Sequence, residues 1–206
     1  MSVKIDRRAF FDGMRRRFGG RLTQQQVDGT EALLAAIECE PGILCTQAAY
    51  ILATAWHETA RTMQPVRETL ADSDGEAIRR LDRAWAAGRL PQVSRPYWRR
   101  DADGQTWLGR GHVQLTHRTN YARASELVGV DLLADPSRAM DPAISATILV
   151  RGALMGLFTG HRLANYLTPM TADYIGARRV INGRDRARDI AAYAHLFERT
   201  LKKAAA

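Results

Sequence analysis

The chain has 206 residues, with 46% hydrophobic and 25% charged content, as expected for a globular protein that can bury a core. Its 30 Lys and Arg against 22 Asp and Glu give a net charge of +8, which favours encounter with an anionic partner. The longest apolar stretch, residues 144–158, is interrupted by Arg151 and is too short to cross a bilayer, so we expect no stable membrane insertion.

The N-terminal 20 residues are basic but contain no apolar run of the length found in a secretory signal. We therefore expect synthesis in a reducing compartment, with Cys39 and Cys45 as free thiols. Two cysteines alone cannot form a known metal-binding pattern.

Two amphipathic helices are predicted before residue 43. The first spans residues 3–18 and ends at a Gly-Gly pair. The second begins after Thr23, which forms a capping box with Gln26, and Pro41-Gly42 ends it.

A third helix is predicted over residues 46–62. Apolar residues recur at helical spacing along one side of it, and His57-Glu58-Thr59 lies near its end. Glu58 falls at the edge of the apolar stripe, where partial desolvation favours the neutral carboxylic acid that can donate a proton. The alternative is a solvated glutamate on the surface of an amphipathic helix.

Residues 62–107 differ in character, because Pro, Gly and Arg recur and only residues 76–87 have a helical pattern. We interpret residues 63–107 as a small inserted lobe or flap beside a groove, within a single domain that spans residues 1–206.

The next stretch, LGRGHVQLTHRTNY (108–121), combines a Gly-Arg-Gly turn at Arg110 with the polar residues Gln114, Thr116 and Asn120. It does not match the dinucleotide-binding fingerprint, because the third glycine is missing and no strand pattern precedes it.

The remaining chain is predicted to be helical. Asp135-Pro136 and Asp141-Pro142 each predict an N-cap followed by proline at the first helical position. Thr171 is predicted to cap a further helix, Asn182-Gly183 to turn the chain, and residues 185–203 to form the last helix. The expected fold is mainly α.

The sequence does not support catalysis by a bound metal ion or by a serine or cysteine nucleophile. His57-Glu58 does not begin a zinc-protease motif, because Arg61 occupies the position of the second histidine. No G-x-S-x-G sequence is present, and no cysteine is placed beside a histidine. We therefore expect neither a metal nor a cofactor.

A carboxylate pair remains as the candidate chemistry. Glu68 follows Glu58 after Pro65, so the chain can turn and bring the two across a cleft. Glycoside hydrolysis needs such a pair, one protonated acid and one ionised base. Glu76 is an alternative base, and the other interpretation is that it is only a surface residue of the lobe helix.

Three motifs occur in one order: His57-Glu58-Thr59, then Gly109-Arg110-Gly111-x-x-Gln114-Leu115-Thr116 with Asn120-Tyr121, then Ile181-Asn182-Gly183 before the last helix. Together they resemble glycoside hydrolase family 19, and more closely its chitinase-like bacteriophage endolysins. The resemblance implies a lysozyme-like, mainly helical fold with a groove between two lobes.

The resemblance also implies roles for single residues. Glu58 would be the general acid, Glu68 the general base, and Thr116 would help to hold the attacking water. The residues expected to bind the sugar chain are Gln114, Asn120, Asn182, Arg110 and Tyr121, although Arg110 could instead form a salt bridge that fixes its turn. The family's arginine before the last helix is not matched, because Asp189 stands at that position.

The expected function is that of an endolysin which cleaves β-1,4 bonds in peptidoglycan glycan strands with inversion, for host cell lysis. We expect a monomer without a separate cell-wall-binding domain. It would stay in the host cytoplasm until a separate membrane-permeabilising partner gives it access to the wall. The alternatives are a chitinase acting on poly-N-acetylglucosamine and a non-catalytic cell-wall-binding module. Nucleic acid is not expected as a partner, because no helix concentrates arginines beside base-reading side chains.

Overall fold

The computed structural model describes residues 4–205, which form eight α-helices, four short 3-10 helices and one two-stranded sheet. The α-helices are α1 (Arg7–Arg17), α2 (Gln24–Glu38), α3 (Cys45–Glu58), α4 (Asp74–Ala86), α5 (Arg118–Val128), α6 (Pro142–Met155), α7 (Tyr174–Ala177) and α8 (Ala187–Ala204). The strands are β1 (Val66–Arg67) and β2 (Arg110–Gly111), and the 3-10 helices are η1 (Glu68–Leu70), η2 (Pro136–Met140), η3 (Leu163–Asn165) and η4 (Arg178–Val180). The mainly α expectation is confirmed.

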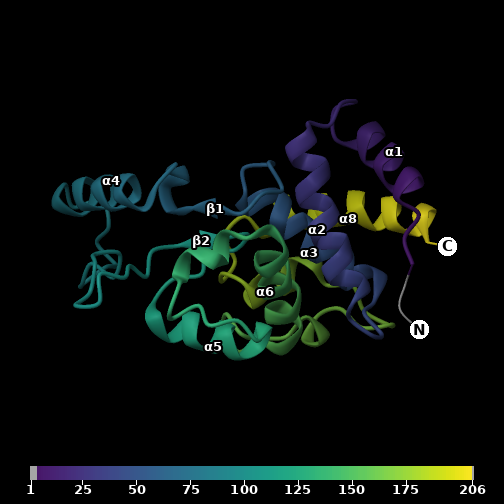
Figure 1. Cartoon of the computed structure of the whole chain (residues 1–206). Coiled ribbons are helices and arrows are strands. Elements are labelled where there is room, and N and C mark those ends of the chain that lie inside the picture. The colour runs from purple at the N-terminus through teal and green to yellow at the C-terminus, as the bar shows by residue number, and fades with distance from the viewer. Residues whose placement is uncertain (1–3, 206) are drawn as a thin grey trace.

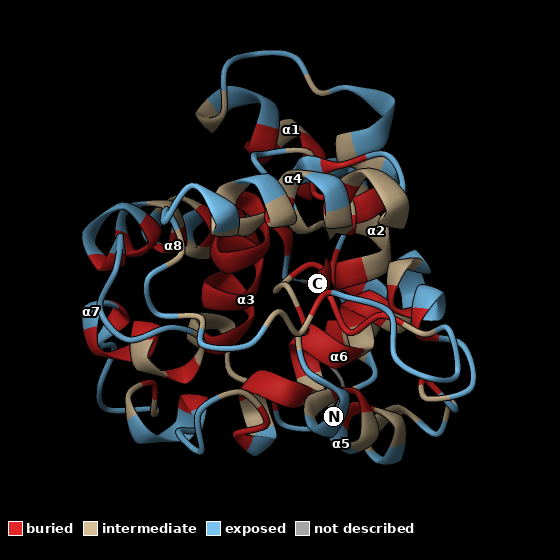
Figure 2. Ribbon diagram, turned by 90° about the vertical axis from the view of Figure 1, so that its left-hand side faces the viewer, coloured by how far each residue is buried: buried red, intermediate tan, exposed pale blue. Residues whose placement is uncertain are grey.

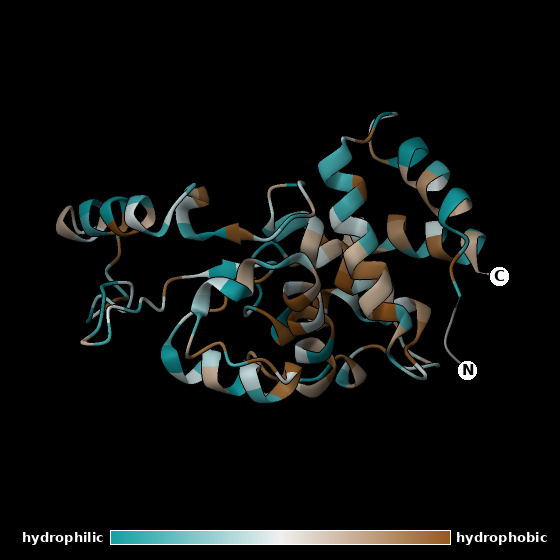
Figure 3. Ribbon diagram, in the orientation of Figure 1, coloured by the Kyte–Doolittle hydropathy of each residue, from teal (hydrophilic) through white to brown (hydrophobic). Residues whose placement is uncertain are grey.

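The helical body is built around α3, which is buried over most of its length (Figure 2). Its apolar residues share one core with those of α1, α2, α6 and α8. Hydrophobic and hydrophilic residues alternate along these helices (Figure 3). A second apolar cluster lies between α5 and α6. A helix surrounded by other helices in this way is a rigid support for the residues at its end.

α3 ends at Glu58, four residues before the predicted end. The Thr59 hydroxyl donates to the Ala55 carbonyl and accepts the Met63 N–H, which turns the chain out of the helix. Ala60 and Arg61 then adopt positive φ angles of 51° and 71°. No glycine marks this left-handed turn, so helix periodicity alone extends the helix too far.

A lobe projects from the body between β1 and β2 (Figure 1). It contains α4 and has its own small apolar cluster of Ala71, Ala77, Leu81, Trp98 and Leu108. β1 and β2 pair antiparallel, with Val66 opposite Gly111 and Arg67 opposite Arg110. The inserted lobe is therefore attached to the body through two short strands.

The C-terminal half shows two differences from the predicted boundaries. Asp173, and not Thr171, caps α7, because its carboxylate accepts the Gly176 N–H at 2.7 Å. α8 begins at Ala187, since Arg186 before it has a left-handed φ of 53°. The capping box of Thr23 and Gln26 and the aspartate cap of α6 are confirmed.

Cys39 and Cys45 are free thiols, as expected. Within residues 4–205, every helix is too short or too polar to cross a membrane.

Candidate active site

Glu58 lies at the C-terminal end of α3 and is held by a buried arginine. Arg178 Nη1 donates to Glu58 Oε1 at 2.5 Å, and the side-chain exposures are 2% for Arg178 and 21% for Glu58. Glu58 Oε2 makes no hydrogen bond to any residue of the described chain. One oxygen is thus fixed by a charge-assisted bond, and the other is available to a ligand.

Arg178 connects Glu58 to the loop before α8. Its Nε donates to the Asp185 carbonyl at 2.9 Å, and its own carbonyl accepts the Asn182 N–H at 3.0 Å. Asn182 is exposed, and its side chain makes no hydrogen bond within residues 4–205. The loop therefore places the backbone of Asn182 beside the residue that holds Glu58.

Glu68 lies at the start of η1, where β1 leads into the lobe, and both of its carboxylate oxygens are occupied. Tyr97 donates its hydroxyl to Oε1 at 2.6 Å, and the Gly109 N–H donates to Oε2 at 2.7 Å. Two donors suit an ionised carboxylate, which only accepts hydrogen bonds. Burial and the hydrogen bond to Glu68 raise the pKa of Tyr97, so its hydroxyl stays a donor.

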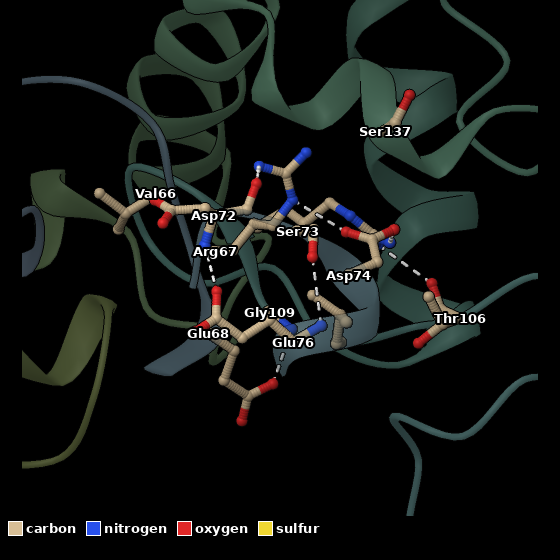
Figure 4. A network of polar contacts seen from close by, with 12 residues as sticks. Val66, Arg67, Glu68, Asp72, Ser73, Asp74, Glu76, Thr106, Gly109 and Ser137 are labelled. Carbon is tan, nitrogen blue, oxygen red and sulfur yellow. Dashed lines mark hydrogen bonds and ion pairs between the residues drawn. The ribbon is translucent and has the colours of Figure 1, made fainter. Parts of the chain in front are cut away.

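Arg110 and Tyr121 form the base of the lobe. Arg110 is 1% exposed and donates to the Asp74 carboxylate at 2.5 Å, to the Thr106 carbonyl and to the Tyr121 hydroxyl. Asp74 also accepts from Arg67 at 2.9 Å (Figure 4). Burial alone would raise the pKa of Asp74, but the bonds from Arg110 and Arg67 outweigh it and hold the pKa below its usual value.

The burial of Arg110 and Tyr121 corrects the expectation that they bind sugar. Tyr121 is fully buried, and its hydroxyl donates to the Leu108 carbonyl at 2.8 Å. Neither side chain offers a surface to a polysaccharide, and the salt-bridge alternative for Arg110 is confirmed. Their residue types suited both roles, and only their burial distinguishes the two.

Three other sequence-predicted residues lie near β2 and the start of α5. Gln114 is half-buried and donates to the Val66 carbonyl at 2.8 Å, which links its turn to β1. Asn120 donates to the Thr116 carbonyl at 2.9 Å. The Thr116 hydroxyl makes no hydrogen bond within residues 4–205, so it is free to hold water.

Glu76, the alternative base, belongs to an ion pair within the lobe. Its carboxylate accepts from Arg80 at 2.5 Å. It also accepts from the Asp72 N–H at 3.1 Å (Figure 4). The Asp72 N–H and the charge of Arg80 lower the pKa of Glu76. Glu76 therefore lies in a surface ion pair of the lobe helix.

Two hollows are lined by residues that precede or follow Glu58 in the sequence. A hollow of about 350 Å³ is lined by the turn that connects Glu58 to Glu68, including Thr59 and Arg67. A second one, of about 410 Å³, is lined by Trp56, His57 and residues of α8. The two carboxylates themselves line neither hollow, and the pairing of Glu58 with Glu68 across a groove stays a prediction.

Arg178 is the residue that sequence reasoning missed. It follows α7 directly and stands next to Arg179, and nothing in the local pattern shows which of the two is buried. The sequence did indicate that Glu58 would have a basic partner, because a carboxyl at the edge of an apolar surface needs one. It does not indicate which of the 30 Lys and Arg residues is the partner.

Comparisons with known proteins agree with the fold. The sequence profile of the glycoside hydrolase family described as Chitinase class I matches residues 47–155. Endochitinase 4 of Solanum tuberosum and a basic 30 kDa endochitinase of Solanum lycopersicum are each 44% identical over 45 residues. These matches span 21% of this chain and only 15% and 14% of the two relatives.

The fold is also similar to that of chitinase C from Streptomyces griseus HUT6037. The two share 19% identity, with a TM-score of 0.55 over 96% of this chain and 92% of the other. At this identity the likeness concerns the fold, which is the expected lysozyme-like, mainly helical one.

Proposed function

This chain belongs to the chitinase class I family of glycoside hydrolases, and we propose that it hydrolyses β-1,4 glycosidic bonds by inverting general acid/base catalysis. The observation that carries the proposal is the pair of Glu58 and Arg178. A partly exposed carboxyl lies at the end of a buried helix, with one oxygen fixed and the other free.

Glu58 is the general acid in this mechanism. Arg178 fixes Oε1, so the proton on Oε2 has a defined direction toward the glycosidic oxygen. The rigidity of α3 supports this, because a small misplacement of an acid is costly in rate.

Glu68 is the general base and activates a water on the opposite face of the sugar. Its two donors hold an ionised carboxylate in one orientation. Thr116 has a free hydroxyl to help position the water, and Gln114, Asn120 and Asn182 contact the sugar chain. An inverting enzyme needs about 6.5–9.5 Å between the two carboxyls to admit the water.

We propose bacterial peptidoglycan as the substrate and lysis of a phage host as the role. The net charge of +8 supports this, because the wall is anionic whereas chitin is neutral. The enzyme acts as a monomer, needs no metal or cofactor, and depends on a membrane-permeabilising partner to leave the host cytoplasm.

The test compares digests of purified peptidoglycan and of chitin oligomers by mass spectrometry. The wild type should release fragments with new reducing ends from the wall, and Glu58→Gln should release essentially none. Unchanged digestion by Glu58→Gln would show that Glu58 is not the general acid. Digestion of chitin alone would favour the chitinase alternative, and wall binding without any digestion would favour the binding module.

A further inference from the structure

The loop that holds Arg178 carries a dense group of arginines beside Glu58. Residues 178–189 contain five arginines and two aspartates. Arg184, Arg186 and Arg188 are exposed, and together with Ile175 and Asp189 they line a hollow of about 600 Å³. We call these three residues the arginine loop.

This hollow continues toward the catalytic helix. Arg186 and Asp189 also line the neighbouring hollow of about 410 Å³, whose other wall includes Trp56, His57 and Arg61. The two hollows share these two residues and adjoin each other, and we refer to them together as the groove between the arginine loop and the end of α3.

The charges in this groove are poorly compensated. Within residues 4–205, the side chains of Arg61, Arg184 and Arg188 make no hydrogen bond or ion pair. The one pairing is that of Arg186 with Asp189, at 3.5 Å and with side-chain exposures of 65% and 53%. Free guanidinium groups around a concave surface attract an anion, and their planar fork suits a carboxylate.

The backbone at Arg186 gives a second indication. Its φ of 53° is a left-handed conformation in which glycine or asparagine costs less than arginine. The side chain it carries opens into both hollows. Strain at a residue that lines a groove is a pattern found at ligand-binding sites.

Hydrogen bonds of Arg178 also connect the arginine loop to Glu58. Arg178 binds Glu58 through Nη1 and the Asp185 carbonyl through Nε, so one guanidinium separates Glu58 from the arginine loop. A substrate strand placed against Glu58 would bring groups attached to its sugars close to this loop.

We propose that the arginine loop, with Arg61, forms a carboxylate-binding subsite that selects glycan strands with acidic substituents over neutral poly-N-acetylglucosamine. The inference rests on the proposed function. The carboxylates could be those of the peptide stems or of lactyl groups, and both are absent from a neutral N-acetylglucosamine polymer. Ile175, 44% exposed, adds an apolar contact for the substituent.

The test uses Arg184→Gln/Arg188→Gln, since neither side chain has a partner within residues 4–205. The matched control is Arg8→Gln/Lys203→Gln, which removes the same charge from exposed positions beside the C-terminal end of α8. The Asp6 N–H donates to the Ala204 carbonyl at that end, whereas the arginine loop precedes the other end of α8 (Figure 1). The 18 residues of α8 separate the two sites by about 27 Å.

kcat and KM are measured on four substrates: native wall glycan, wall whose peptide stems an amidase has removed, wall whose carboxyls have been converted to amides, and chitin oligomers. On native wall, the loop variant should raise KM about tenfold with kcat unchanged, because it loses contacts present in both ground and transition states. On amidated wall and on chitin it should match the wild type. A defect retained on stem-free wall assigns the lactyl carboxylate, and a defect lost there assigns the stems.

Three results would overturn the inference while leaving the proposed function intact. These are unchanged kinetics on native wall, an equal loss on all four substrates, and an equal loss in the Arg8→Gln/Lys203→Gln control. Weaker retention of duplex DNA with unchanged wall hydrolysis would assign the loop to nucleic acid instead.

If the wild type hydrolyses none of the substrates, the proposed function fails. Sedimentation with native and amidated wall then decides the subsite. Glu58→Gln should bind native wall about tenfold more tightly than Glu58→Gln carrying the two loop changes, and binding to amidated wall should not differ. Equal binding to native wall would overturn the inference.

Discussion

Arg178 donates a hydrogen bond of 2.5 Å to Glu58, although 120 residues separate them in the sequence. The contact joins the end of α3 to the 3-10 helix before α8. It places a permanent cation behind the carboxyl, deep enough that the guanidinium is 2% exposed. The position of the proposed acid therefore depends on the C-terminal quarter of the chain as well as on its own helix.

Arg178→Lys should reduce kcat on wall glycan about 100-fold, with a small change in KM. Lysine keeps the charge but cannot donate in two fixed directions, so either Glu58 or the Asp185 carbonyl loses its donor. Steady-state kinetics check this, together with a thermal melt to confirm folding.

Arg179→Lys is the matched control. Arg179 is the neighbouring arginine, and its half-buried side chain makes no hydrogen bond within residues 4–205. It should retain wild-type kcat. An equal loss in both variants would show that the Glu58 contact is not the reason for the defect.

Tyr97→Phe tests whether the lobe helps to hold the proposed base. The change removes the donor to Glu68 Oε1 and leaves the Gly109 N–H as the remaining donor. We expect kcat to fall about tenfold, from looser positioning of the carboxylate, whereas Glu68→Gln should cost about 100-fold or more. Glu76→Gln, in the lobe ion pair, should leave kcat unchanged.

Tyr166→Phe provides the control for removing a hydroxyl, because Tyr166 bonds His161 far along the chain from Glu68. Full activity of Glu68→Gln would exclude Glu68 as the base. A loss in Glu76→Gln would transfer the role to that residue.

Asp74→Asn should destabilise the protein by about 3–5 kcal/mol, because it leaves the guanidinium of Arg110 buried without a counter-charge. Denaturant unfolding measures this loss. Glu76→Gln breaks a more exposed ion pair in the same lobe and should lose much less. Equal losses of stability in the two variants would mean that the burial of Arg110 does not determine the cost of removing its counter-charge.

Much of the fold could be predicted from local chemistry. The capping box of Thr23 and Gln26 and the Asp141-Pro142 start of α6 are decided by residues within one helical turn, so their sequence signals were sufficient. The apolar periodicity of residues 46–62 likewise placed Glu58 near the end of a helix, because that signal is local too. Where α3 ended could not be predicted, since Ala60 and Arg61 carry the left-handed turn without a glycine.

The partners of the site could not be predicted, because they are tertiary contacts between similar residues. Arg178 and Arg179 differ only in which of them faces α3, and packing decides that. Arg110 was expected either at the sugar or in a salt bridge, and its burial against Asp74 and Tyr121 selects the second. A motif identified Glu58 and Arg110, but the partners of both came from more than 30 residues away or from another element.

His112 should make the protein less stable in mild acid. Burial lowers its pKa from 6.5 to about 4, against hydrogen bonds with Met63 and Ser145. Its Nε2 lies 3.0 Å from the Met63 carbonyl, which only accepts, so the neutral ring carries its proton there, and Nδ1 accepts from the Ser145 hydroxyl at 2.7 Å. Protonation of Nδ1 would replace that acceptor with a donor.

Between pH 6.5 and 4 the unfolded chain binds a proton at this histidine that the folded chain does not, so stability falls as the pH falls. The shift corresponds to a loss of about 3 kcal/mol across that window. Urea unfolding at a series of pH values should show this slope in the wild type and in His161→Gln, which changes an exposed histidine. His112→Gln should be less stable near pH 7 yet show a flatter dependence, because no buried imidazole remains to protonate. A slope equal to that of the wild type would place the acid sensitivity between pH 6.5 and 4 in groups other than His112.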